Sequence, residues 1–201
     1  MFKSLFSGVL MCAMALGVVG ASEARAQAKV GEPAPAFTLQ DQDGQPVTLE
    51  SFKGKTVVLE WFNNECPYVQ KFYTGGDMNR LAEEYASRDV VWLAVNSTKS
   101  KDNAANKAIA GEWKIARPIL NDATGVTGKA YGAKTTPHMY VINPQGTLVY
   151  AGAIDDKKSA ETSDIATSKN YVRAALDETL AGKTVSTAET KAYGCSVKYA
   201  K

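Results

Sequence analysis

TVVLEWFNNECPYVQKFY, residues 56–73, is the stretch that decides the fold. Its first seven residues are β-branched or apolar except Glu60, and such a run predicts a buried strand. Pro67 fixes a backbone angle that suits the first turn of a helix. The helical pattern continues until the glycine pair at 75–76. The stretch therefore predicts a strand that passes directly into a helix, with Cys66 at the junction.

The rest of the chain alternates strands with helices. Residues 36–55 predict two short strands joined by a turn at DQDG. Downstream we expect a second helix to residue 85, a strand at 90–97, a helix at 103–113, a short strand at 117–122, a helix ending near Gly132, a hairpin at 137–154 and a helix at 168–180. This order predicts an α/β fold, a central mixed β-sheet flanked by helices with an N-terminal β-hairpin extension. The order of elements is similar to that of the thioredoxin-like fold.

The N-terminal 28 residues have the features of a secretory signal peptide. Lys3 precedes the apolar run LFSGVLMCAMALGVVG, and small residues fit cleavage after Ala26 or Ala28. The run is short and broken by glycine, which favours a cleaved segment over a retained anchor. We therefore expect a periplasmic or secreted protein without stable membrane insertion. It would have a signal peptide at 1–28, one domain similar to the thioredoxin-like fold at 29–182 and a C-terminal tail at 183–201.

Charge excludes some partners. The chain carries 23 Lys and Arg against 21 Asp and Glu, for a formal net charge of +2. No basic stripe is present, so nucleic acid is not an expected partner. Lysines interrupt the acidic stretch DDKKSAETSD, residues 155–164, and we interpret it as a solvated loop rather than a calcium site. No metal or cofactor is expected.

Two cysteines remain after removal of the signal peptide, Cys66 and Cys195. Cys66 lies where a helix begins, and the helix N-terminus stabilises a thiolate. A thiolate is the nucleophile in both disulfide exchange and peroxide reduction. Two cysteines allow one intramolecular pairing, and an exported protein can keep a disulfide. A Cys66–Cys195 bond would close a loop of about 130 residues, either as a structural clasp or as a catalytic pair.

Three other positions are candidates for the site. A carboxylate at Glu60 in a buried strand needs a partner, and burial would suit it to exchange the thiol proton; a salt bridge or escape to solvent is the alternative. Pro137, after Thr136, belongs at the start of a strand or in a tight turn. His138 is the only histidine and can tune Cys66 or donate a proton, or can be purely structural.

Four segments carry a resemblance to a known family: EWFNNECPYVQKFY, VVWLAVNS, AYGAKTTPHMYVINPQGTLVYAGAIDD and YGCSVKY. Together they resemble the peroxiredoxin-like branch (redoxin, AhpC/TSA type) of the thioredoxin superfamily, from about residue 31 to 199. The resemblance implies that Cys66 is the reactive cysteine, that Glu60 is a buried acid and that Pro137 is a cis-proline. It also implies that the Thr136 backbone contacts the substrate.

The chain also departs from the family pattern. Val69 stands where thioredoxins have their second cysteine, and Asn63 stands where typical peroxiredoxins have threonine or serine. Near Pro137 there is no arginine to polarise a peroxide, only His138 and Lys134. The second thiol must therefore come from the C-terminal tail or from another protein.

These observations predict an exported thiol-dependent oxidoreductase or antioxidant protein. Cys66 would attack a peroxide or a disulfide, Cys195 would resolve the product, and an external thiol would reduce the resulting bond. Two alternatives stay open. One is a redox-quiet interaction protein with a structural Cys66–Cys195 disulfide, and the other is a copper-binding thiol chaperone that uses both cysteines and His138.

Overall fold

The computed structural model describes residues 27–200, so nearly all of the predicted signal peptide lies outside the described residues. A seven-stranded sheet, in the order β2-β1-β5-β4-β3-β7-β8, forms the centre of the molecule. β3, β4 and β5 are parallel, whereas the other neighbours are antiparallel. The strands are β1 (Thr38–Gln40), β2 (Pro46–Thr48), β3 (Thr56–Trp61), β4 (Val90–Asn96), β5 (Ile119–Asn121), β7 (His138–Ile142) and β8 (Leu148–Gly152).

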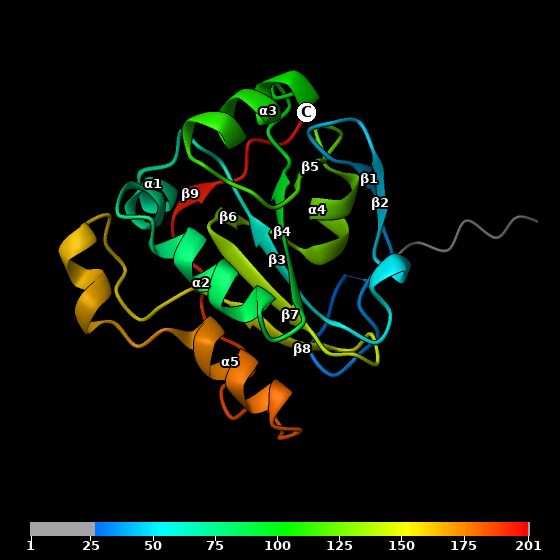
Figure 1. Cartoon of the computed structure of the whole chain (residues 1–201), viewed down its shortest axis with the longest axis vertical. Coiled ribbons are helices and arrows are strands. Elements are labelled where there is room, and N and C mark those ends of the chain that lie inside the picture. Colours follow the sequence, from blue (N-terminus) through cyan, green and yellow to red (C-terminus); the bar gives the residue numbers. More distant parts are fainter. Residues whose placement is uncertain (1–26, 201) are drawn as a thin grey trace, which may run out of the picture.

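Helices cover both faces of this sheet (Figure 1). They are η1 (Glu50–Phe52), α1 (Pro67–Thr74), α2 (Asp77–Ala86), α3 (Asn103–Glu112), α4 (Val126–Tyr131), η2 (Thr162–Thr167) and α5 (Tyr171–Leu180). α1, α2, α3 and α5 contribute to one hydrophobic cluster, and α4 and the N-terminal segment contribute to the other. The predicted mixed α/β sheet flanked by helices is confirmed.

β3 separates the two clusters because successive side chains of a strand point to opposite faces. All six of its residues are buried. Val58 belongs to the cluster under α1 and α2, whereas Val57, Leu59 and Trp61 belong to the cluster on the α4 face. Glu60 therefore faces α1, the helix that begins immediately after Cys66.

Two local predictions were wrong. The last helix begins at Tyr171, three residues later than expected, because the Asn170 side chain caps it by accepting from the Arg173 N–H at 2.9 Å. The stretch 155–164 is not simply a solvated loop, since Asp155 is only 1% exposed and pairs with Lys71 of α1.

The C-terminal tail packs on the body of the molecule. Cys195–Ser196 form β9, which pairs antiparallel with β6 (Thr135–Thr136) in a separate two-stranded sheet. In Figure 1 the red β9 lies close to α1 and β6. Within residues 27–200, none of the helices combines the length and apolarity that crossing a membrane requires.

Candidate active site

Cys66 occupies the junction that the sequence predicts. It is the N-cap residue of α1, with extended backbone angles, and Pro67 opens the helix. The Cys66 carbonyl accepts hydrogen bonds from the N–H groups of Val69 and Gln70, each at 2.9 Å. Its side chain therefore lies at the positive end of the helix dipole. Cys66 is only 1% exposed, so solvent reaches it poorly in this conformation.

Cys195 lies against Cys66 although 129 positions separate them in sequence. β9 places Cys195 directly opposite Thr136. The Cys66 thiol donates to the Thr136 carbonyl oxygen at 3.0 Å, and the Cys195 thiol hydrogen bonds to Cys66. The Thr136–Pro137 peptide bond is cis. Both cysteines are free thiols, and Cys66 is buried whereas Cys195 is partly exposed.

The surroundings shift the pKa values of the two thiols in opposite directions. Burial by itself raises the pKa of Cys66, but hydrogen bonds from Cys195 and Thr136, and from the backbone of Cys195 and Val69, bring that pKa below its usual value. Burial, followed by the hydrogen bond to Cys66 and its negative charge, raises the pKa of Cys195 to about 11. Of the two cysteines, Cys66 is therefore the one that loses its proton more readily and is the better nucleophile, and Cys195 is the one that keeps its proton.

Thr136 has a side chain suited to stabilise this thiolate. Its Oγ1 atom is buried and has no hydrogen-bond partner among residues 27–200. A buried hydroxyl without a partner is costly. The Thr136 hydroxyl is thus available to donate to the Cys66 sulfur, in keeping with its contribution to the lowered pKa.

Glu60 is fully buried and has its own set of donors. It accepts from the Tyr73 hydroxyl at 2.8 Å, from Trp92 Nε1 at 3.1 Å and from Arg117 at 3.2 Å. Burial and the Glu60 charge raise the pKa of Tyr73 well above its usual value, so this hydroxyl stays protonated. Within residues 27–200 no hydrogen bond joins Glu60 to Cys66. The structure does not bring the predicted acid into direct contact with the thiol.

Arg117 is the partner that sequence reasoning missed. Besides Glu60, its guanidinium donates to the Tyr73 hydroxyl at 2.6 Å and to Asn79 Oδ1 at 2.9 Å. Arg117 lies just before β5, some 20 positions from Pro137, the segment where the family pattern leads one to expect an arginine. A buried carboxylate in β3 needs a cation on a neighbouring element. The segment RPILND, residues 117–122, begins with an arginine directly before a predicted strand and could have indicated this cation.

His138 lies on the other face of the sheet from Glu60. It stands opposite Trp61 in the β3–β7 pairing, whereas Glu60 stands opposite Met139. Cross-strand partners share a face, and Trp61 packs in the cluster on the α4 side. Burial, together with the charge of Lys134, lowers the pKa of His138 to about 4. The structure does not bring His138 to the two sulfur atoms.

The turn before Cys66 carries less negative charge than its sequence indicates. Glu65 forms an ion pair with Lys101 at 2.7 Å, and the Asn63 side chain accepts from the Glu65 N–H at 2.9 Å. The outer side of this turn borders an open cavity of about 700 Å³, lined by residues that include Asn64, Glu65 and Trp113. Cys66 is not among its lining residues, so this cavity does not open onto the sulfur in the present conformation.

The fold and the paired thiols define a class, that of thioredoxin-like thiol oxidoreductases. Within this class the chain matches the model of the AhpC/TSA family over residues 30–151, and it belongs to that family. This confirms the resemblance inferred from the sequence.

Individual relatives carry two kinds of name. The chain is 28% identical over 142 residues to thiol-disulfide oxidoreductase ResA of Bacillus subtilis (strain 168), covering 70% of this chain and 77% of ResA. It is 30% identical over 138 residues to chloroplastic peroxiredoxin Q of Sedum lineare, covering 64% and 72%. The family is thus one of oxidoreductases that include both thiol-disulfide oxidoreductases and peroxiredoxins.

Solved structures agree on the fold. The crystal structure of hypothetical protein SMc02350 from Sinorhizobium meliloti 1021 matches with a TM-score of 0.73 and 28% identity, covering 87% of this chain and 96% of that one. Peroxidoxin BcpB from Mycobacterium tuberculosis matches with a TM-score of 0.58 and 21% identity, covering 78% and 98%. The latter supports the fold alone, and the predicted thioredoxin-like fold is confirmed.

Proposed function

We propose that this chain is an exported two-cysteine thiol oxidoreductase in which Cys66 attacks the substrate and Cys195 resolves the product. The observation that carries the proposal is that the β6–β9 pairing places Cys195 opposite Thr136, whose carbonyl oxygen lies 3.0 Å from the Cys66 sulfur. The pKa values of the two thiols are shifted in opposite directions, to the thiolate side for Cys66 and to the thiol side for Cys195. A nucleophile and a protonated partner in contact are what a two-step thiol exchange requires.

The chemistry balances for either substrate class. With a disulfide, the Cys66 sulfur forms a mixed disulfide and one substrate thiolate leaves. Cys195 then loses its proton and attacks Cys66, which releases the second substrate thiol. With a peroxide, a sulfur–oxygen bond forms as the oxygen–oxygen bond breaks, and an alcohol or water leaves. Attack by Cys195 on the sulfenic acid then releases water. In both cases an external thiol reductant returns two electrons to the Cys66–Cys195 disulfide.

Trapping the first intermediate tests the proposal. In a Cys195→Ser variant, treatment with hydrogen peroxide or with oxidised glutathione should leave a sulfenic acid or a mixed disulfide on Cys66. The unsubstituted protein should instead form the Cys66–Cys195 disulfide. Peptide mass spectrometry distinguishes these products. A Cys195→Ser protein that accumulates neither adduct at Cys66 would overturn the proposal.

A second function is favoured by one observation, the near-complete burial of Cys66. A disulfide formed there would be well shielded and could act as a structural clasp in an interaction protein. Its reduction potential separates the two functions, because structural disulfides lie below about −300 mV and working ones lie above. The copper-chaperone alternative has less support, since His138 does not join the two cysteines. Among residues 27–200, no group of three or more His, Cys, Asp or Glu could hold a metal.

A further inference from the structure

Tyr193 lies two residues before Cys195 and is buried between α1 and the loop that follows β8. Its ring packs edge-on against Tyr68 of α1, with ring centroids 5.9 Å apart. Its hydroxyl donates a hydrogen bond to Asp155 Oδ1. Burial and this bond to a carboxylate raise the pKa of Tyr193, so the hydroxyl stays a donor over the working pH range.

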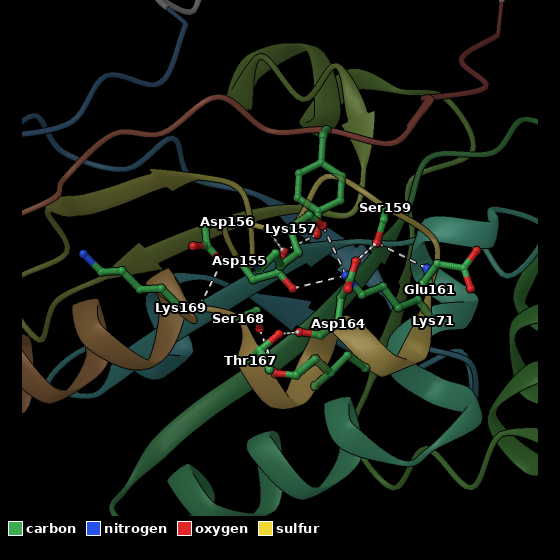
Figure 2. A network of polar contacts seen from close by, with 12 residues as sticks. Lys71, Asp155, Asp156, Lys157, Ser159, Glu161, Asp164, Thr167, Ser168 and Lys169 are labelled. Atoms are coloured by element: carbon green, nitrogen blue, oxygen red, sulfur yellow. Dashed lines mark hydrogen bonds and ion pairs between the residues drawn. The ribbon is translucent and has the colours of Figure 1, made fainter.

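Asp155 is in turn held by a buried ion pair. Lys71 Nζ lies 3.4 Å from Asp155 Oδ2, and neither side chain is exposed to solvent. Figure 2 shows these two side chains pointing toward each other, with Lys157 beside them. The Lys157 N–H donates to Asp155 Oδ1 at 3.0 Å, and its carbonyl accepts from Lys71 Nζ at 3.2 Å. Every charged atom of the pair therefore has a partner, which a buried ion pair needs in order to be stable.

These hydrogen bonds connect the helix that begins after Cys66 with the tail that carries Cys195. Lys71 belongs to α1, five residues after Cys66, and Tyr193 belongs to the tail that carries Cys195. On the other side of Cys195, the Val197 N–H donates to the Lys134 carbonyl at 3.1 Å. The Tyr199 hydroxyl donates to the Ala133 carbonyl at 2.7 Å. The chain is thus held by hydrogen bonds on both sides of Cys195, and on the Tyr193 side the acceptor is the buried carboxylate of Asp155.

We propose that Tyr193, Asp155 and Lys71 are positioning residues that hold Cys195 over Cys66 and keep the tail closed on the thiolate. The inference rests on the proposed function, in which these two sulfur atoms react with each other. Its consequence is that a hydrogen bond made by Tyr193 sets both the access of reagents to Cys66 and the stability of the Cys66–Cys195 disulfide. Hydrogen bonds to a buried carboxylate are stronger than neutral ones, which suits Tyr193 to this task.

Tyr193→Phe is the informative variant. It keeps the ring that packs on Tyr68 and removes only the hydroxyl, and Asp155 retains Lys71 and the Lys157 N–H. In the reduced protein, alkylation of Cys66 by iodoacetamide should become about tenfold faster, the factor that corresponds to the loss of one such hydrogen bond. The equilibrium of the Cys66–Cys195 disulfide with glutathione should shift toward the reduced form by a similar factor. Peptide mass spectrometry measures both.

Tyr85→Phe is the matched control. Tyr85 is fully buried and also donates to a carboxylate, Asp177 Oδ1 at 2.8 Å, but it belongs to α2 and contacts α5. This variant should keep both the alkylation rate and the disulfide equilibrium within about twofold of the unsubstituted protein. Unchanged values in Tyr193→Phe, or equal changes in both variants, would overturn the inference.

The alkylation experiment can fail or succeed independently of the proposed function. Alkylation of the reduced protein needs neither an oxidant nor turnover. If no substrate ever oxidises Cys66, the proposed function fails. A faster alkylation in Tyr193→Phe alone would then still show that Tyr193 positions the tail.

Discussion

At the scale of single residues, Thr136 is one of the groups that lower the pKa of Cys66, after Cys195. Replacement by valine keeps the shape and removes a hydroxyl that has no hydrogen-bond partner among residues 27–200. Thr136→Val should therefore raise the pKa of Cys66, since the thiolate loses a donor. The pH dependence of Cys66 alkylation measures this pKa, and its midpoint should move to higher pH.

Thr135→Val is the control for this prediction. The Thr135 hydroxyl donates to the Pro137 carbonyl at 3.4 Å and is not among the causes of the Cys66 shift. Its substitution should leave the alkylation midpoint in place. A midpoint that Thr136→Val does not move would exclude the hydroxyl as a donor to the thiolate.

The lowered pKa of His138 predicts a pH dependence of the free energy of unfolding rather than an effect on catalysis. Its pKa is about 4 in the folded protein against 6.5 as the ordinary value, because burial disfavours the charged ring. As the pH falls from 6.5 to 4, the unfolded chain binds the proton first, so folding free energy is lost over this window. The loss is at most about 3 kcal/mol.

Denaturant unfolding at pH 7 and at pH 4.5 tests this statement. His138→Gln should lose less stability than the unsubstituted protein between the two pH values, because the only histidine is gone. The variant should not change the alkylation midpoint of Cys66, since His138 faces away from the thiolate. If the free energy of unfolding falls equally in both proteins between pH 7 and pH 4.5, the pH dependence does not come from His138.

At the scale of elements, β9 depends on a glycine. Gly194 has φ +130°, and a Cβ built there would lie 2.0 Å from the Thr136 carbonyl oxygen, so the backbone must move. Gly194→Ala should separate β9 from β6, at a cost of about 1–3 kcal/mol. The Val197 amide, which donates to Lys134, should then lose its protection from hydrogen exchange.

Gly111→Ala, in α3, is the matched substitution. A Cβ at Gly111 meets nothing within 4 Å, so alanine should be tolerated there, and Val197 should stay protected. If Val197 also stays protected in Gly194→Ala, the close approach of the tail does not depend on glycine.

The elements also show which parts of the fold could be predicted from the sequence. β3 and α1 could be predicted because a buried strand and a Pro-initiated helix have local signals. β9 could not, since it spans only two residues and is ordered by pairing with Thr135–Thr136, distant in sequence. The same applies to the pairing of Lys71 with Asp155. The mixed charges of residues 155–164 predict a solvated loop. The tertiary structure brings Lys71 of α1 to Asp155 of this loop, and the sequence has no local signal for that contact.

At the scale of the whole molecule, the tail covers an edge of the sheet as well as the active site. β8 is the last strand of the sheet. The Ala151 N–H donates to the Ala188 carbonyl at 3.0 Å, and the Ala151 carbonyl accepts from the Thr190 N–H at 3.1 Å. Val185 is buried in the cluster under α1 and α5. Residues 183–193 therefore pack on the edge strand and the core, whereas residues 194–200 lie over the site.

Two truncations separate these roles. A chain that ends at Tyr193 keeps the cover of β8 but loses β9 and the contacts of Val197 and Tyr199. Its melting temperature should therefore fall by only a few degrees, while Cys66 is alkylated faster. A chain that ends at Gly182 loses the buried Val185 side chain, about 1.5–3 kcal/mol. It also exposes an unpaired strand edge, which favours association between chains. Its melting temperature should fall and it should form oligomers on size-exclusion chromatography. If it instead stays monomeric and equally stable, the predicted boundary at 182 is a true domain boundary and the tail serves only the cysteines.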